Sequence, residues 1–488
     1  METVVKLKGH HSSVSSLSCT AQILASGDED GWCIVHDVGT EQVLFNADLK
    51  SKIGLPAVTS GAADDPEISQ DDASVSAVCW SPSSNSVLFT AVSTRAFLFD
   101  LRAGVVPQQE FSVCKEDIVS LDVNTKGTFL SLADDSGAVQ VVDLTAKRVY
   151  KSLRQAHSNI CSSVTFRRYR PWELVSGGLD MTVARWDFSR AKELCRWSFG
   201  SGSGLDGNDA EPQMFNPPMV HQVALGDKTS EDRSAARLAA AVLGNGAIAL
   251  FDVDSDHQAS TGAARSEKKN KGSTTKQSTA LKDISEVILG VGLPCTSTAL
   301  PGLRMELGSS YGGHTASASC CCFIPGSLDL MEENVQETGE GESDDTILNR
   351  GEFSVHRYAD SLGKDAGVGS HSASTSYSFK EMMVASGGDD RRILLWSIPR
   401  AVRAYCRQQS LNKQVHAFDL DDHNTKLPVP QPPSLHPLVL EVSHKRKVNA
   451  LNIMQCSVAD KGWLLNVADT SKNITCYRFK HDHVNATT

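Results

Sequence analysis

The sequence lacks the short motifs that mark P-loop nucleotide-binding proteins and zinc hydrolases. It has no Gly-x-x-x-x-Gly-Lys-Ser/Thr segment for phosphates and no His-Glu-x-x-His for zinc. Its longest purely apolar run, residues 238–243, is far too short to cross a bilayer, and residues 1–9 contain no apolar signal region. We therefore expect a protein that is not an enzyme and does not enter a membrane.

Disulfides are not expected either, although the chain has 13 cysteines. Their number is odd, their spacing is scattered, and no secretory signal is recognisable, which favours reduced thiols inside the cell. Cys320, Cys321 and Cys322 are consecutive, so their thiols would alternate between the two faces of a strand. Zinc sites use separated pairs, so this run indicates packing. We expect no cofactor or metal, and a cytoplasmic or nuclear location, or both.

Charge makes nucleic acid an improbable main partner, because the net charge is −11. One basic turn, formed by Arg167, Arg168 and Arg170, is expected to be a solvated rim. A basic low-complexity stretch at 264–278 is expected to be a linker, with nuclear localisation as the alternative. The sequence thus predicts other proteins as partners, bound by a monomeric chain within a complex.

Short alternating strands are what the sequence does contain, most clearly at residues 156–190. A His near the start is followed by three strands at period two, joined by tight turns, and the third strand ends in Trp186-Asp187. An aspartate closes the corresponding strand at positions 100, 143 and 187, which lie about 43 residues apart. This pattern resembles a WD40 repeat, one four-stranded blade of a β-propeller.

The resemblance implies an all-β fold, a seven-bladed WD40 β-propeller over residues 1–488. The propeller is expected to be closed by the N-terminal strand 3–7, which pairs into the last blade and removes two exposed edges. An eighth blade between 254 and 310 is the alternative, because 288–293 is strand-like. The seven expected blades are 9–45, 75–112, 116–151, 156–199, 219–307, 313–410, and 445–479 with 3–7.

Long inserts interrupt this pattern at 46–73, 254–300, 326–379 and 397–440. The third of them holds eight carboxylates and no cation between Asp329 and Asp345. Such compositions predict disordered, solvated segments.

A hydrogen-bonded chain of His, Ser, Asp and Trp inside each blade is implied by the WD40 resemblance. A His/Asp pair also suggests catalysis, but the repeat supplies this pairing for structure alone. The expected members are His10, Ser26 and Asp30 in the first blade, His157, Ser176, Asp180 and Trp186 in the fourth, and His314, Ser386, Asp390 and Trp396 in the sixth. In the first blade His36 stands where tryptophan is usual.

A finer resemblance lies in segments 131–144, 157–167 and 174–186 and near residues 448–479, which are similar to the family of WD repeat-containing protein 53. That family is grouped with substrate receptors of cullin-4 RING ubiquitin ligases, which dock on an adaptor through Asp-x-Arg at the end of a third strand. The resemblance implies this role for Asp100 and Arg102, and more weakly for Asp187 and Arg190, where the arginine comes one residue late. The alternative is an arginine that only pairs with the aspartate of its own blade.

Three functions therefore compete. The first is a protein-interaction scaffold, specifically a ligase substrate receptor with an unknown client. The second is a peptide or histone-tail reader that uses carboxylates and aromatic side chains on the top face of the propeller, or a general assembly scaffold. The third, an enzyme, has no catalytic constellation to support it.

Overall fold

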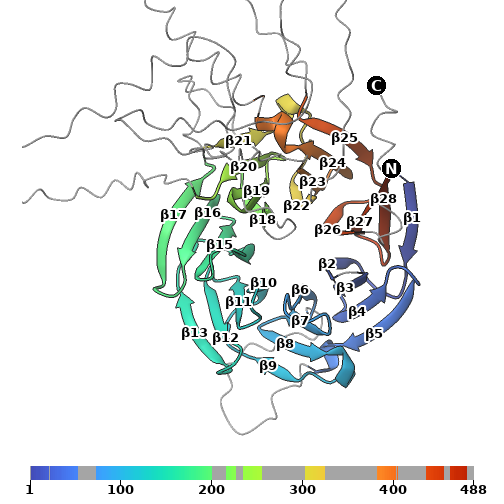
Figure 1. The fold of residues 1–488 in the computed structure, drawn as a ribbon, viewed down its shortest axis with the longest axis vertical. Coiled ribbons are helices and arrows are strands. Elements are labelled where there is room, and N and C mark those ends of the chain that lie inside the picture. Colours follow the sequence, from blue (N-terminus) through green and yellow to red (C-terminus); the bar gives the residue numbers. More distant parts are fainter. Residues whose placement is uncertain are drawn as a thin grey trace, which may run out of the picture.

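The computed structural model describes residues 2–20, 22–52, 73–200, 216–226, 235–254, 303–324, 382–402, 404, 436–455 and 462–480. These residues form seven four-stranded antiparallel sheets arranged around one axis (Figure 1). The sheets are named blades one to seven in chain order. The all-β, seven-bladed fold predicted from the sequence is confirmed. The expected inserts at 254–300 and 326–379 fall almost wholly outside the described residues, as does the strand-like 288–293.

The structure describes blades one to four without a break, apart from residue 21 and residues 53–72 between the first two blades. Blade one consists of β2 (Val14–Thr20), β3 (Ile23–Asp28), β4 (Trp32–Asp37) and β5 (Gln42–Asp48). Blade two consists of β6 (Val75–Trp80), β7 (Val87–Val92), β8 (Arg95–Asp100) and β9 (Gln109–Phe111). Blade three consists of β10 (Ile118–Val123), β11 (Phe129–Asp134), β12 (Val139–Asp143) and β13 (Arg148–Leu153). Blade four consists of β14 (Ser163–Phe166), β15 (Glu173–Gly178), β16 (Thr182–Asp187) and β17 (Lys192–Ser198).

Blades five to seven have longer gaps between their strands. Blade five consists of β18 (Val220–Leu225), β19 (Leu238–Leu243), β20 (Ile248–Asp252) and β21 (Arg304–Leu307). Blade six consists of β22 (Ala318–Ile324), β23 (Met383–Gly388), β24 (Arg392–Ser397) and β25 (Leu438–Ser443). Blade seven consists of β26 (Val448–Gln455), β27 (Gly462–Asp469), β28 (Ile474–Lys480) and β1 (Glu2–Leu7). Short 3₁₀ turns are η1 (Lys50–Lys52), η3 (Leu101–Ala103), η5 (Ala235–Arg237) and η6 (Ser309–Tyr311).

Two blades end at least three residues beyond their expected ranges. Strand β5 of blade one continues to Asp48, three residues into the expected insert 46–73. The fourth strand of blade six is β25, which lies beyond the expected range 313–410; it begins within the expected insert 397–440 and ends before the expected last blade at 445. The reason is the insertion between β24 and β25, which separates two paired strands by about forty residues of chain. Pairing across a loop of this length adds only a slowly growing entropic cost, so the sheet still completes.

The ring closes as the sequence predicts. Strand β1 pairs antiparallel with β28, with Leu7 opposite Ile474. Figure 1 shows β1 at the outer edge of the ring beside β28. His36, at the position usual for tryptophan, donates from Nε2 to the carbonyl oxygen of Lys8 at 2.9 Å. This bond ties the end of β1 to the third strand of blade one, so a histidine here serves the closure of the ring.

Apolar side chains fill the seven spaces between neighbouring blades. Each buried cluster of the described residues takes its members from two adjacent blades, including the one between blades seven and one. Three second strands carry a glycine against a valine of the next blade: a Cβ on Gly27, Gly177 or Gly387 would lie within 2.7 Å of Val75, Val220 or Val448. The blades can approach this closely because these positions have no side chain.

Side chains near the start of the first strands bind the next blade directly. Ser15 Oγ donates to the carbonyl of Val75 at 2.7 Å, and Asn449 Nδ2 donates to the carbonyl of Val14 at 2.9 Å. Equivalent bonds run from Ser76 to Ile118, from Ser162 to Val220, and from Ser319 to Val448. These polar bridges fix the angle between neighbouring sheets, because buried carbonyls must find donors.

Candidate functional site

The His-Asp pairs of the blades are buried structural networks. In blade four, His157 Nδ1 lies 2.9 Å from Asp180 Oδ1, and its Nε2 lies 2.8 Å from Ser176 Oγ. Trp186 Nε1 donates to the same hydroxyl at 3.0 Å. His314, Asp390, Ser386 and Trp396 repeat this arrangement in blade six. Each hydroxyl is fully buried and engaged with two neighbours, so the networks hold strands in register.

Blade one differs from the expected network. His10 Nδ1 lies 2.8 Å from Asp28 Oδ2, and its Nε2 lies 2.7 Å from Ser26 Oγ, whereas Asp30 is exposed. The expectation of Asp30 was wrong because it followed the spacing of the other blades. In blade four the position of Asp28 is Gly178, where a Cβ would meet His157 Nδ1 at 2.5 Å. A side chain can stand there only when it is itself the partner of the histidine.

A further histidine network in blade seven was missed. His444 Nε2 lies 2.8 Å from Asp469 Oδ2, and its Nδ1 lies 2.8 Å from the hydroxyl of Tyr477. His444 precedes Val448, the start of β26, by four residues, as His10 precedes Val14 and His314 precedes Ala318. The sequence therefore contains a signal for His444, namely a histidine four residues before the first strand of a blade.

The networks of blades four and six favour the ionised form of their aspartates. Burial alone would raise the pKa of Asp180, but hydrogen bonds from His157, Thr182 and the Ser158 backbone outweigh it and hold this pKa well below its usual range. Hydrogen bonds from His314 and the Thr315 backbone lower the pKa of Asp390 in the same way. The hydrogen-bonding groups of each His-Asp pair are therefore used within the blade itself.

The two predicted docking arginines lie at the ends of third strands. Arg102 Nη2 and Nε donate to Asp100 at 2.7 and 2.9 Å, and the side chain of Arg102 is 76% exposed. This pairing holds the pKa of Asp100 at about 2. Arg190 Nε lies 3.6 Å from Asp187 Oδ2, and its side chain is 78% exposed. Both arginines pair with the aspartate of their own blade while their guanidinium groups face solvent.

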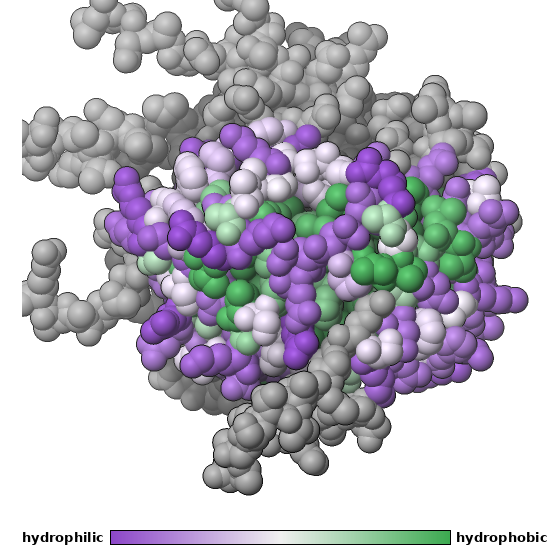
Figure 2. Space-filling view, turned by 90° about the horizontal axis from the view of Figure 1, so that it is seen from below, coloured by the Kyte–Doolittle hydropathy of each residue, from purple (hydrophilic) through white to green (hydrophobic). Residues whose placement is uncertain are grey.

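Exposed apolar residues gather along the same rim. We define the rim as the face formed by the turns between third and fourth strands and by those between first and second strands. The two sets of turns are joined in blades two and four, where Leu101 N donates to the carbonyl of Ser86 and Phe188 N to that of Trp172. Among the described residues, the exposed large apolar side chains all lie in or beside these turns of blades one to four: Val43, Leu44, Val105, Val106, Val149, Tyr150, Trp172 and Leu194. Figure 2, which views the ring from its edge, shows hydrophobic patches reaching the surface between hydrophilic residues.

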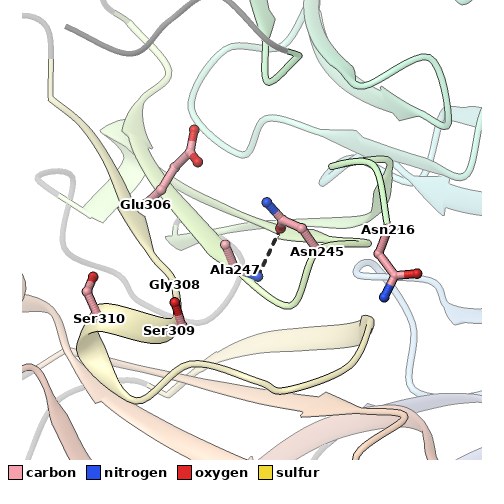
Figure 3. A pocket seen from close by; sticks show the side chains of 7 residues that line it. All are labelled: Asn216, Asn245, Ala247, Glu306, Gly308, Ser309 and Ser310. Carbon is pink, nitrogen blue, oxygen red and sulfur yellow. Dashed lines mark hydrogen bonds between the residues drawn. The ribbon is translucent and has the colours of Figure 1, made fainter. Parts of the chain in front are cut away.

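A shallow polar pocket of about 530 Å³ lies between blades five and six. Asn216, Asn245, Glu306 and Ser309 are among its lining residues (Figure 3). Asn245 Oδ1 accepts from the backbone of Ala247 at 3.1 Å and so shapes its own turn. Besides Glu306, the polar side chains of its described lining are the amides of Asn216 and Asn245 and the hydroxyls of Ser309 and Ser310.

Neither a metal cluster nor a reactive thiol is found at the consecutive cysteines that the sequence singles out. No group of three or more His, Cys, Asp or Glu side chains in the described part of the chain is arranged to hold a metal ion. The thiols of Cys320, Cys321 and Cys322 have raised pKa values because they are buried, which disfavours the reactive thiolate. Nor does any described helix have the length and apolar character needed to cross a membrane.

These features define a seven-bladed β-propeller whose blades resemble WD40 repeats, a fold typical of protein-interaction scaffolds. A model of the WD40 family, described as WD domain, G-beta repeat, matches residues 1–37. The chain is similar to the WD repeat-containing protein 53 homolog of Dictyostelium discoideum, with 27% identity over 270 residues. The match covers 52% of this chain and 66% of that relative, just under two thirds of its length.

Proposed function

We propose that this propeller is a substrate receptor that docks on the adaptor of a cullin-4 RING ubiquitin ligase through Arg102. The observation that carries the proposal is the pair at the end of β8. Asp100 accepts two N–H groups of Arg102 in a fork and so fixes the direction of an otherwise flexible side chain. An ordered, exposed guanidinium can donate its remaining N–H groups to carboxylates or carbonyls of a partner.

The surroundings of Arg102 suit protein docking. Val105 and Val106 follow it in the same connection and are 44% and 61% exposed. Arginine is enriched in protein interfaces, and the buried centre of an interface is more apolar than the rest of the protein surface. Support for the ligase in particular comes from the family resemblance of the sequence, and the similarity to the Dictyostelium relative agrees with that family.

Charge reversal tests the proposal. We expect Arg102→Glu to abolish co-purification of the cullin-4 adaptor from cells while leaving the melting temperature unchanged, because the side chain is exposed. Arg102→Lys, which keeps the charge but loses the fork, should weaken the interaction only in part. The matched control is Lys472→Glu, an exposed charge reversal in the turn between β27 and β28 on the opposite face. Adaptor recovered equally with Arg102→Glu and with the control would refute the proposal.

A reader of cationic peptides on the opposite face is the second candidate. Glu116, Asp117 and Asp135 gather there, and burial together with the neighbouring carboxylates raises the pKa of Asp135. A cationic side chain would relieve this repulsion. A peptide array that includes lysine- and arginine-rich tails tests this function. Some peptides should bind the wild type and bind Asp135→Asn more weakly; if no peptide behaves in this way, the function is excluded.

A further inference from the structure

We propose that an aromatic patch between blades three and four binds an acidic segment of a partner protein that carries an aromatic or aliphatic anchor residue. The patch is defined as Phe129, Tyr150, Trp172 and Phe188. It lies on the rim, separate from the Arg102 pair of blade two, and the inference goes beyond the proposed adaptor docking because it states the chemistry of the client.

Four elements bring these rings into contact. The ring centroids of Phe129 lie 5.1 Å from Tyr150, 5.8 Å from Trp172 and 5.4 Å from Phe188. Tyr150 and Trp172 stack with an interplanar angle of 30°. Phe188 is fully buried and packs on Phe166 beneath, so the base of the patch is rigid. Tyr150 and Trp172 form its outer surface and are 37% and 47% exposed.

The fold does not require a tryptophan side chain at Trp172. It occupies the turn after Arg170-Pro171, at the N-terminal end of β15, and its carbonyl already serves the fold by accepting from Phe188 N at 3.0 Å. The backbone contact needs no indole side chain. A half-exposed tryptophan stacked on a tyrosine over a buried phenylalanine is the arrangement of an interface anchor.

Cations surround the patch on both sides. Lys147 and Arg148 are exposed beside Tyr150, and the Lys151 ammonium lies 5.8 Å from the Tyr150 ring. On blade four, Lys192 is exposed, and so is Arg190, whose Nε lies 3.6 Å from Asp187 Oδ2. This basic character runs against the net charge of −11 of the whole chain.

The carboxylates near the patch are already engaged within the fold. Glu173 and Asp254 bind the buried Arg167, and Glu193 binds Arg196 at 2.6 Å. Asp143 accepts from two backbone N–H groups of its own turn. The outward charge is therefore positive, and the complementary occupant is anionic with an apolar side chain for the rings. A protein segment is favoured over nucleic acid, because only two rings are exposed and the cations flank them at isolated points.

Binding of defined peptides tests the inference. The probes are fluorescein-labelled seven-residue peptides with Phe, Trp, Leu or Ala at the centre and three Asp or Glu on each side. We expect the Phe, Trp and Leu peptides to bind the intact chain in anisotropy titrations, and the Ala peptide at least tenfold more weakly. Trp172→Ala should weaken the Phe peptide at least tenfold, and Arg190→Glu with Lys192→Glu should do so without altering the melting temperature. Lys472→Glu is the matched control and should bind as the wild type does.

Three kinds of result would overturn the inference. One is no binding of any peptide up to 1 mM, or equal binding by wild type and both patch variants. Another is tighter binding of single-stranded RNA homopolymers than of the peptides, or self-association of the chain that Trp172→Ala abolishes. The third is loss of adaptor co-purification in Trp172→Ala, which would assign the patch to the adaptor. Failure of the adaptor proposal is separable, because Arg102→Glu should leave peptide binding unchanged.

Discussion

His10 of blade one binds Asp28, the last residue of β3, whereas His157 of blade four binds Asp180, two residues beyond β15. The two carboxylates reach the histidine from different backbone positions, yet both lie within 2.9 Å of Nδ1. Asp28 also accepts from the backbone N–H groups of Asp30 and Trp32, so it caps the turn as well. One buried acceptor thus serves both the histidine and the turn.

This difference predicts opposite outcomes for two neighbouring aspartates. Asp28→Ala leaves His10 and two backbone donors without their buried acceptor and should lower the free energy of unfolding by about 3 kcal/mol. Asp30→Ala removes an exposed side chain and should change it by about 0.5 kcal/mol at most. Urea denaturation of the two variants compares them directly. The reverse order would contradict the assignment of Asp28.

Acid should weaken the network of blade four. The pKa of Asp180 is lowered in the folded protein, while an unfolded aspartate titrates near 3.9. The ionised carboxylate therefore contributes stability above about pH 4, and this contribution is lost as the pH falls towards the lower folded-state pKa. In thermal melts, we expect Asp180→Asn to be less stable than wild type at neutral pH and the difference to shrink below about pH 4. A difference that grows in acid would be incompatible with this sign.

Crowding between blades one and two should make Gly27 intolerant of a methyl group. A Cβ there would lie 2.4 Å from Val75 Cγ1 and 2.6 Å from its Cβ, so Gly27→Ala should destabilise by about 1–3 kcal/mol. Gly200→Ala is the control, since the nearest atom to its Cβ would be at 3.7 Å. Adding Val75→Ala should restore part of the loss in Gly27→Ala. Without such restoration in a double-mutant cycle, the contact is not the cause.

The closing strand should be the most sensitive part of the N-terminal region. Leu7 is 2% exposed and packs between blades seven and one, so Leu7→Ala should cost about 2–5 kcal/mol. The adjacent Lys6 is exposed, and Lys6→Ala should have little effect. Unfolding curves followed by circular dichroism measure both. Equal stability of the two variants would mean that β1 does not hold the ring.

Most of the ring could be predicted because its strands carry local signals. The alternation and turn residues of blade four are contiguous, and an unpaired strand at 3–7 beside a last blade short of one strand predicts the closure. Strand β25 escaped prediction although Leu438–Ser443 alternates, because nothing local shows that it pairs with β24 across a long insertion. Pairing between distant segments depends on tertiary contacts that periodicity does not encode.

The candidate sites were only partly visible in the sequence. Asp100 and Arg102 stand two residues apart, so their pairing follows from local geometry. The aromatic patch could not be foreseen, because Phe129, Tyr150, Trp172 and Phe188 come from two blades and meet only when the sheets pack. His444 could have been found by its spacing from the following strand, and Asp28 only by asking what fits beside the ring of His10.

The pairing of β1 with β28 also sets an order of events during synthesis. Residues 2–7 are made long before their partner strand, which ends only at Lys480. Until blade seven has been made, Val14 and Leu24 of blade one lack the neighbours that bury them in the finished ring. Apolar side chains of blade one that face blade seven are therefore the part of a growing chain that aggregation or chaperone binding would involve until β28 has been made.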